Sequence, residues 1–335
     1  MDSVFAFGLL TAGLALLLFS GRHFVEAIAA IAEALGVPPV VVGMTLVAFG
    51  TSTPELVINV LAASRGETAL AFGNIAGSST INIGFVLAIT AIVRPLKVEP
   101  SLITREIPML WVAVGALLVL SHDIWLNGAA VDSLERSDGL ILLLLFGIFV
   151  YYTVIYSLAK RKLTGIQAAD AFLEEAEQEA EGLRRGSLLR LGVVTVLSLV
   201  GISLGADWTV DGATGVARML GMSENLIGLT IVSFGTTLPE LVTCIAAARR
   251  GDADIALGNV VGSNLFNILA IGGLVCTVNP VAIPPGGGMD LAFMALLSAV
   301  LLPLAIRSGQ TVTRGEGVLL MGAYIGFLVW RLQGF

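Results

Sequence analysis

The sequence predicts an all-α integral membrane protein with ten transmembrane helices, arranged as two inverted five-helix repeats. Three observations lead to this fold class. Apolar residues make up 56% of the 335 residues and charged residues only 13%, about half the charged share of an average soluble domain. The mean hydropathy is +0.93, and a soluble fold would have to expose much of that apolar surface to water. The third observation is an internal repeat.

Apolar runs long enough to cross a bilayer recur along the whole chain. A helix that spans the hydrocarbon layer needs about 20 mostly apolar residues, and it satisfies its own backbone hydrogen bonds there. The expected spans cover residues 4–20, 38–64, 68–93, 103–121, 138–158, 188–206, 223–248, 253–278, 289–306 and 315–332. The first and sixth spans are expected to continue obliquely as amphipathic helix toward residues 35 and 220.

One hydrophilic segment separates an N-terminal half, 1–158, from a C-terminal half, 188–335. This connector, 159–187, begins Lys160-Arg161-Lys162, carries a run of glutamates and ends at Arg184-Arg185. It is either an acidic regulatory or cation-collecting element, or a solvated helical connector. Its charge pattern favours the connector, on the cytoplasmic side.

The internal repeat places residues 43–89 on residues 228–274 without a gap, with 21 identical positions of 47. The matches include Pro, Glu, Asn and paired Gly residues, which a chance similarity of apolar sequence would not align. Upstream, Glu26 falls on Asp211. Five spans per half place the second half in the opposite orientation, an architecture typical of secondary transporters.

Basic residues predict the orientation of the chain. With the N-terminus outside, the outer side receives only four of the 18 lysines and arginines, namely Arg65, Arg136, Arg218 and Arg331. Both termini are therefore expected outside. No basic patch suggests a nucleic-acid partner, and Cys244 and Cys276 lie in apolar stretches as expected packing residues.

Polar and helix-breaking residues interrupt the second and seventh spans. The interruptions read Gly50-Thr51-Ser52-Thr53-Pro54-Glu55 and Gly235-Thr236-Thr237-Leu238-Pro239-Glu240. Because proline has no N–H, each break frees carbonyl groups near it, and free carbonyls persist in a membrane only where protein or a hydrated cavity surrounds them. A kink used only for packing is the alternative for each proline.

Glu55 and Glu240 are the only acids in the cores of their spans. An ionised carboxylate at the bilayer centre costs at least about 2.5–3.5 kcal/mol, so such residues mark ion or proton pathways. If the two halves bring both together, one divalent or two monovalent cations would cancel the charge. The alternative is a protonated glutamate that bonds a neighbouring helix.

The third and eighth spans supply neutral oxygens. Ser78 and Asn82 are four residues apart, as are Ser263 and Asn267, so each pair shares a helix face. Carboxylate, amide, hydroxyl and carbonyl oxygens at one level suit a hard cation. These side chains could instead hold helices together by hydrogen bonds.

The paired motifs GTSTPEL with GNIAGSSTIN, and GTTLPEL with GNVVGSNLFN, resemble the cation/Ca²⁺ exchanger superfamily, and most of all its prokaryotic Na⁺/Ca²⁺ exchangers. The resemblance covers essentially the whole chain. It implies a core of spans two, three, seven and eight around the ions, past which the long first and sixth helices slide to alternate access.

The resemblance also implies the ligands. Ca²⁺ would be held by the carboxylates of Glu55 and Glu240 and the carbonyls of Thr51 and Thr236. Na⁺ would share the carboxylates and add Ser52, Ser78, Thr237 and Ser263, with carbonyls of Ala48 and Ser233. Relatives that use K⁺ carry Asp at the position of Asn267, so the neutral Asn267 implies K⁺-independent exchange.

The expected function is therefore Ca²⁺/Na⁺ antiport by a multi-pass protein of a prokaryotic inner membrane, with a monomeric functional unit and no cofactor. The H⁺-coupled branch usually has a more acidic third-span motif than GNIAG, so H⁺/Ca²⁺ antiport is the alternative. A Ca²⁺-gated channel or sensor is a further alternative. No nucleophile–base pair, phosphate loop or cofactor motif suggests an enzyme.

Overall fold

The computed structural model of the chain describes residues 3–35, 37–122, 124, 131–168, 176–220 and 233–333. The described elements of the N-terminal half, with π-helical turns labelled η, are α1 (Ser3–Leu35), α2 (Pro39–Val42), η1 (Gly43–Val47), α3 (Ala48–Thr51), α4 (Thr53–Ser64), α5 (Thr68–Ile81), η2 (Asn82–Leu87), α6 (Ala88–Val93), β1 (Leu96–Lys97), η3 (Leu102–Glu106), α7 (Ile107–Leu120), β2 (Ser133–Leu134) and α9 (Arg136–Ala168). Those of the C-terminal half are α10 (Ala176–Met219), α12 (Ser233–Gly235), α13 (Leu238–Arg250), α14 (Ala253–Leu265), η5 (Phe266–Ile271), α15 (Gly272–Val278), β3 (Val281–Ala282), α16 (Gly287–Gln310), β4 (Thr311–Val312) and α17 (Arg314–Leu332).

The helical membrane class is confirmed, whereas the count of ten spans stays a prediction. Among the described residues, seven helices are long and apolar enough to cross a membrane, and the bent pair Pro39–Thr51 and Thr53–Ser64 makes an eighth. The expected span 223–248 lies partly outside the described residues. The expected span 315–332 is the helix α17, which carries charged residues near both of its ends.

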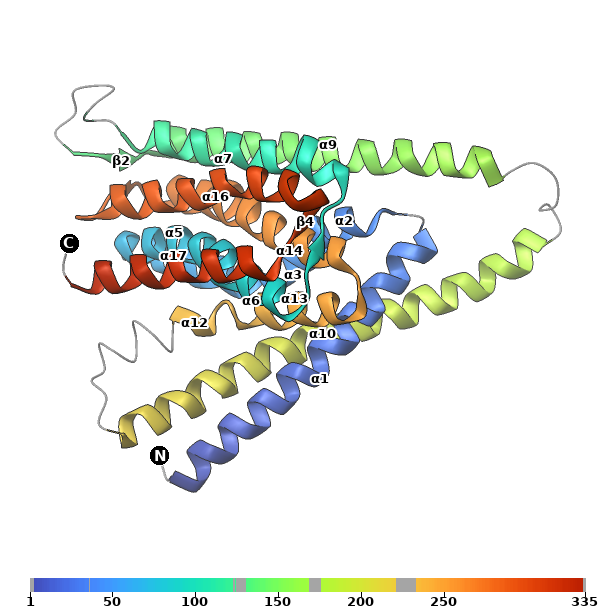
Figure 1. The fold of residues 1–335 in the computed structure, drawn as a ribbon, viewed down its shortest axis with the longest axis horizontal. Helices are drawn as coiled ribbons and strands as arrows, with labels where there is room; N and C mark the ends of the chain where they lie inside the picture. The colour runs from blue at the N-terminus through green and yellow to red at the C-terminus, as the bar shows by residue number, and fades with distance from the viewer. Residues whose placement is uncertain are drawn as a thin grey trace.

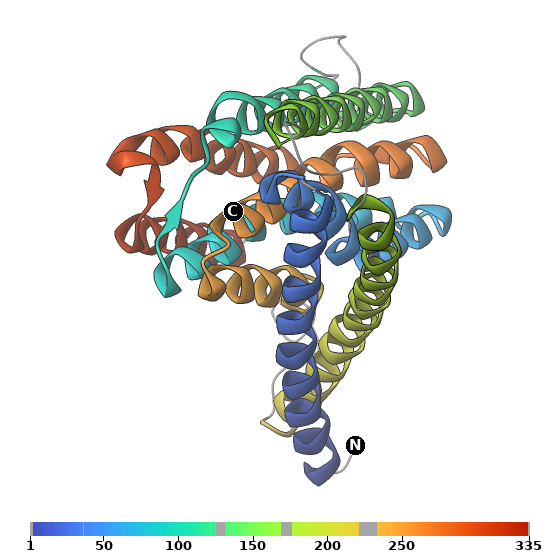
Figure 2. The ribbon, with the colours of Figure 1, turned by 90° about the vertical axis from the view of Figure 1, so that its right-hand side faces the viewer.

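The two longest helices, α1 and α10, form an antiparallel pair that runs obliquely to the others (Figure 1) and stands apart from them in the second view (Figure 2). Both continue past their expected apolar cores, as predicted. Their backbones approach closely: a Cβ on Gly205 would lie 2.7 Å from the backbone nitrogen of Leu17. Small residues therefore allow this contact.

The broken second span packs directly on α14 of the other half. A Cβ on Gly43 would lie 2.7 Å from the carbonyl oxygen of Ile255, and one on Gly258 would lie 2.6 Å from that of Val40. Because these glycines have no side chain, the backbone of the broken span contacts the backbone of α14 directly. As a result, the break near Ser52 lies beside the GNVVGSN segment of the C-terminal half.

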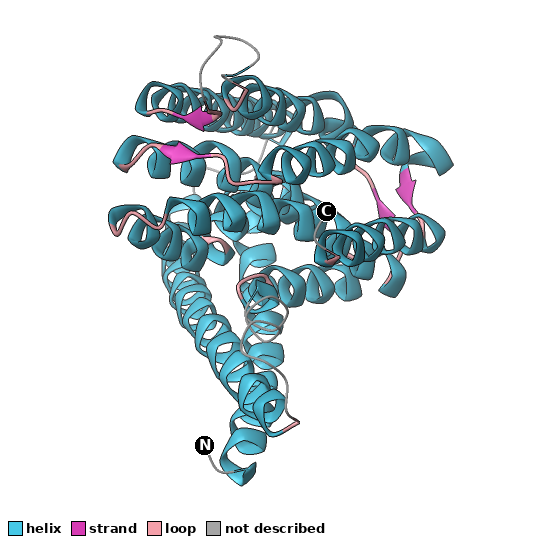
Figure 3. Ribbon diagram, turned by 90° about the vertical axis from the view of Figure 1, so that its left-hand side faces the viewer, coloured by secondary structure: helices cyan, strands magenta, loops and turns pink. Residues whose placement is uncertain are grey.

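Two short strand pairs, which the sequence did not predict, tie the halves together (Figure 3). Strand β1 pairs antiparallel with β4, and β2 pairs antiparallel with β3. Strands β1 and β3 lie at positions related by the sequence repeat, so each pair joins one half to the other. Strands of two residues give no detectable periodicity in a sequence.

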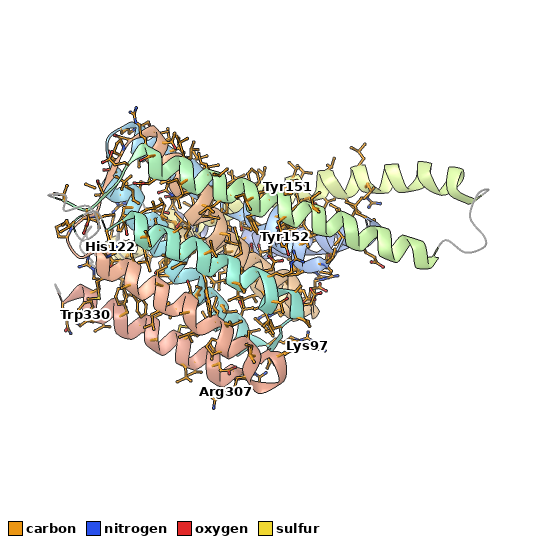
Figure 4. The ribbon with its side chains drawn as sticks, turned by 90° about the horizontal axis from the view of Figure 1, so that it is seen from above. Lys97, His122, Tyr151, Tyr152, Arg307 and Trp330 are labelled. Atoms are coloured by element: carbon orange, nitrogen blue, oxygen red, sulfur yellow. The ribbon has the colours of Figure 1, made fainter. Side chains whose placement is uncertain are left out.

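Lys97 and Arg307, both expected inside, lie away from the end of the molecule that carries His122 and Trp330 (Figure 4). The two chain termini also share one end (Figure 1). Which end faces the cytoplasm stays a prediction.

Candidate functional site: two interrupted helices and their oxygens

The two predicted breaks fall where the proline motifs place them. The second span bends by 49° between Thr51 and Thr53, and α4 begins with Pro54 and Glu55 in its first turn. In the second half, α13 begins after Thr237, again with proline and Glu240 in the first turn. A carboxylate is favourable at a helix N-terminus, where backbone N–H groups are unpaired.

The two glutamates are buried in the interior of the protein. Each side chain is 1% exposed. Ser52 Oγ donates to Glu240 Oε1 over 3.0 Å, which links the first break to the carboxylate of the other half. This bond brings the carboxylate of Glu240 beside the break that precedes Glu55, and the direct meeting of the two carboxylates stays a prediction.

Several of these oxygens have no hydrogen-bond partner among the described residues. They are both carboxylate oxygens of Glu55, Oε2 of Glu240, and the amide oxygens of Asn82 and Asn267. Leaving charged or polar acceptors buried and unpaired is costly. A bound cation would remove that cost, and a set of carboxylate and amide oxygens is the chemistry that hard cations select.

Asn82 and Asn267 lie in π-helical turns rather than in continuous α-helix. Asn82 is the first residue of η2 and Asn267 the second of η5. η2 packs against α13, which carries Glu240, and η5 packs against α4, which carries Glu55. Single π-turns inside α-helices are frequent at functional sites, and here each half places its amide beside the glutamate helix of the other half.

The predicted serine hydroxyls are buried and bond to neighbouring amides. Ser78 Oγ donates to Asn74 Oδ1 over 3.2 Å, and Ser263 Oγ donates to Asn259 Oδ1 over 3.4 Å. Their hydrogens are therefore used within each half, while the oxygen lone pairs remain available for another partner.

Thr51 and Thr237 stand at positions that the repeat does not equate, because Thr51 corresponds to Thr236 and Thr237 to Ser52. The hydroxyl of Thr51 lies 3.1 Å from the carbonyl oxygen of Val47 and 3.3 Å from Asn259 Oδ1. That of Thr237 donates to the carbonyl of Phe234 over 3.0 Å.

Besides Thr51, three predicted positions were expected to contribute carbonyls. The carbonyl of Ala48 accepts a bond of 3.0 Å from the backbone N–H of Ser52. Thr236 is half-buried in the turn between α12 and α13, and Ser233 begins α12. The side chain of Ser233 lies outside the described residues.

The sequence interpretation missed polar residues that brace these ligands. Asn59 Nδ2 donates to the carbonyl of Glu55 over 2.7 Å and to Asn74 Oδ1 over 3.1 Å. At the equivalent position, Cys244 accepts a bond of 3.3 Å from Asn259 Nδ2, so it is more than the packing residue expected. Because each lies four residues after a glutamate on the same helix face, that spacing was the available signal.

A family model described as Sodium/calcium exchanger protein matches residues 5–155 and 191–333. Inner membrane protein YrbG of Escherichia coli (strain K12) is 37% identical over 329 residues, which cover 97% of this chain and 95% of that protein. Sodium/calcium exchanger MaX1 of Methanosarcina acetivorans is 32% identical over 344 residues, which cover 96% and 97%. The structure of the sodium-calcium exchanger NCX_Mj soaked with 10 mM Na⁺ and zero Ca²⁺ superposes with a TM-score of 0.80 at 29% identity, covering 97% of this chain and 98% of that one.

Proposed function

The chain belongs to the sodium/calcium exchanger protein family, and from that premise we propose that this transmembrane ion antiporter exchanges Ca²⁺ for Na⁺ by alternating access. One observation carries the proposal: each half buries a glutamate whose carboxylate has an acceptor oxygen that no described residue satisfies. Among the described residues, no cluster of three or more His, Cys, Asp or Glu forms. A site of two carboxylates and several neutral oxygens suits a transported cation, which must be released after it has bound.

Glu55 and Glu240 are the shared ligands in this proposal. One Ca²⁺ neutralises both carboxylates, with the carbonyls of Thr51 and Thr236 beside them. Na⁺ ions compete for the same carboxylates and take further oxygens from Ser52, Thr237, Ser78 and Ser263 and from the carbonyls of Ala48 and Ser233. The amide oxygens of Asn82 and Asn267 complete the donor set.

Coupling follows from charge. An empty core with two negative charges is too costly to move across the apolar barrier, whereas a core loaded with Ca²⁺ or with two Na⁺ is neutral. A third Na⁺ would leave one net positive charge, which senses voltage by about 2.3 kcal/mol per 100 mV. Exchange is then faster when the membrane potential favours movement of that charge.

The neutral side chain at Asn267 supports K⁺-independent exchange, since the donor set holds two fixed charges rather than three. Sodium as the counter-ion is supported by the names of the relatives MaX1 and NCX_Mj. We place the protein in a prokaryotic inner membrane, as its relative YrbG is named. There it has ten spans in two inverted repeats, both termini outside, and one chain as the functional unit.

The test is Ca²⁺ uptake by proteoliposomes that contain the purified protein. Vesicles loaded with Na⁺ should take up ⁴⁵Ca²⁺ when external Na⁺ is removed, without K⁺, and Glu55→Gln or Glu240→Gln should each abolish uptake. Uptake driven by a pH gradient without Na⁺ would replace the proposal with H⁺/Ca²⁺ exchange. Conductance that persists without a counter-ion would indicate a channel, and binding without flux would indicate a sensor.

A further inference from the structure

The two site asparagines have different surroundings, although the sequence repeat makes them equivalent. Asn82 Nδ2 donates to Oδ1 of Asn264, on α14, over 3.1 Å. The residue equivalent to Asn264 in the N-terminal half is Ser79. Ser79 Oγ is buried and has no hydrogen-bond partner among the described residues. Asn267 therefore receives no hydrogen bond from Ser79 that corresponds to the one between Asn264 and Asn82.

This bond decides which way the carboxamide of Asn82 points. With Nδ2 engaged by Asn264, Oδ1 is left as a buried acceptor with no described partner. Both asparagines are almost fully buried, at 1% and 0% exposed for Asn82 and Asn264. A cation site needs the oxygen and not the N–H₂ group, because only the oxygen can coordinate a metal ion.

We propose that Asn264 is a positioning residue for cation binding, which fixes Asn82 with its amide oxygen free to coordinate the transported ion. The inference rests on the proposed exchange and goes beyond it, since Asn264 itself need not touch the ion. It also makes the donor set asymmetric. Asn82 is held before the ion arrives, whereas Asn267 must be oriented by the ion itself.

The matched variants are Asn264→Ser, which copies the other half, and Ser79→Ala, which removes a hydroxyl that bonds to no described residue. Equilibrium ⁴⁵Ca²⁺ binding and Na⁺-driven uptake are measured on each purified protein. For Asn264→Ser, we expect half-saturation by Ca²⁺ to rise about three- to tenfold, the range of one buried hydrogen bond. The maximal uptake rate should fall by less than that. Ser79→Ala should shift neither quantity.

A purely structural role would lower the yield or the maximal rate and leave half-saturation unchanged, and that result would overturn the proposal. Asn264→Asp gives a second test if Asn264→Ser cannot be purified. An aspartate at position 264 keeps the acceptor for Asn82 Nδ2, so half-saturation should stay at or below the wild-type value, and a rise would count against the proposal. If the wild-type protein showed no Na⁺-dependent uptake, the proposed function would fail instead.

Discussion

Two contacts at equivalent positions in the halves differ in this conformation of the protein. Val242 on α13 is 8% exposed, whereas Val57, its equivalent on α4, is 51% exposed. Val242 lies against Gly21 of α1, where any side chain would collide with it. Helix α1 is therefore closed over α13 at Val242, while Val57 on α4 stays exposed.

The charged residues near these contacts differ in the same way. Arg250, at the end of α13, lies 3.3 Å from Glu26 of α1. Their equivalents, Arg65 and Asp211, are both exposed and form no ion pair with each other among the described residues. Glu26 and Arg250 thus form an ion pair between α1 and α13. The equivalent acid and base of the other half, both of which the structure describes, do not pair with each other.

This difference between the halves indicates how one fold could adopt two conformations. If the halves are equivalent by an inverted repeat, the second state has the two contacts exchanged: α10 closed over α4, and α1 lifted from α13. The asymmetry would then depend on the conformation as well as on the sequence, which has Gly21 in one half and Ala206 at the equivalent position. A change in one half can therefore be compared with the same change at the equivalent position of the other half.

The largest effect is expected from a disulfide across the closed contact. In Gly21→Cys/Val242→Cys the two thiols should lie within bonding reach. Oxidation should stop Na⁺-driven Ca²⁺ uptake, and a reductant should restore it. The equivalent pair, Ala206→Cys/Val57→Cys, should cross-link far more slowly. Equal cross-linking of both pairs would contradict the asymmetry.

A smaller effect is expected from the hydroxyls near the carboxylates. Ser52 donates to Glu240, whereas Thr237, its equivalent, donates to the backbone carbonyl of Phe234. A hydrogen bond to a charged group contributes about 1.5–3 kcal/mol. Ser52→Ala should therefore change the half-saturating Na⁺ or Ca²⁺ concentration by roughly tenfold or more, and Thr237→Ala by clearly less. Uptake titrations compare the two, and a larger effect of Thr237→Ala would show that the described bonds do not govern affinity.

The smallest effect is expected from the ion pair. The side chains of Glu26 and Arg250 are 34% and 41% exposed, and exposed pairs contribute about 0–1 kcal/mol. Glu26→Gln should slow the cross-linking of Gly21→Cys/Val242→Cys by no more than about fivefold, and high salt should remove the difference. Asp211→Asn should leave it unchanged. An effect of Asp211→Asn as large as that of Glu26→Gln would contradict the one-sided contact.

The sequence predicted the fold class and the two breaks because their signals are strong locally. Proline directly before glutamate inside an apolar span indicates more than a packing kink, and the repeat of 43–89 on 228–274 doubles the signal. The short strands and the π-turns at Asn82 and Asn267 leave no periodic pattern, so they could not be foreseen. The span count is harder to predict still, because α17 carries charge near both ends.

The site was predictable in its residue types and not in its hydrogen bonds. A repeat shows which positions are equivalent, but it cannot show that Ser52 bonds to Glu240 while Thr237 bonds to the carbonyl of Phe234. That choice depends on how the two halves pack, which the repeat does not show. Asn264 illustrates the same limit: it stands beside Ser263 in the motif, yet only packing shows that it holds Asn82.

The most direct test of the exchange site is competition for bound Ca²⁺. Purified wild-type protein should bind ⁴⁵Ca²⁺, and Na⁺ should displace it with a Hill coefficient above one, because more than one Na⁺ replaces each Ca²⁺. Neither Glu55→Gln nor Glu240→Gln should bind Ca²⁺ measurably, while both should remain folded by size-exclusion chromatography. Wild-type affinity in either variant, or Ca²⁺ binding that Na⁺ does not displace, would contradict a shared site at the two carboxylates.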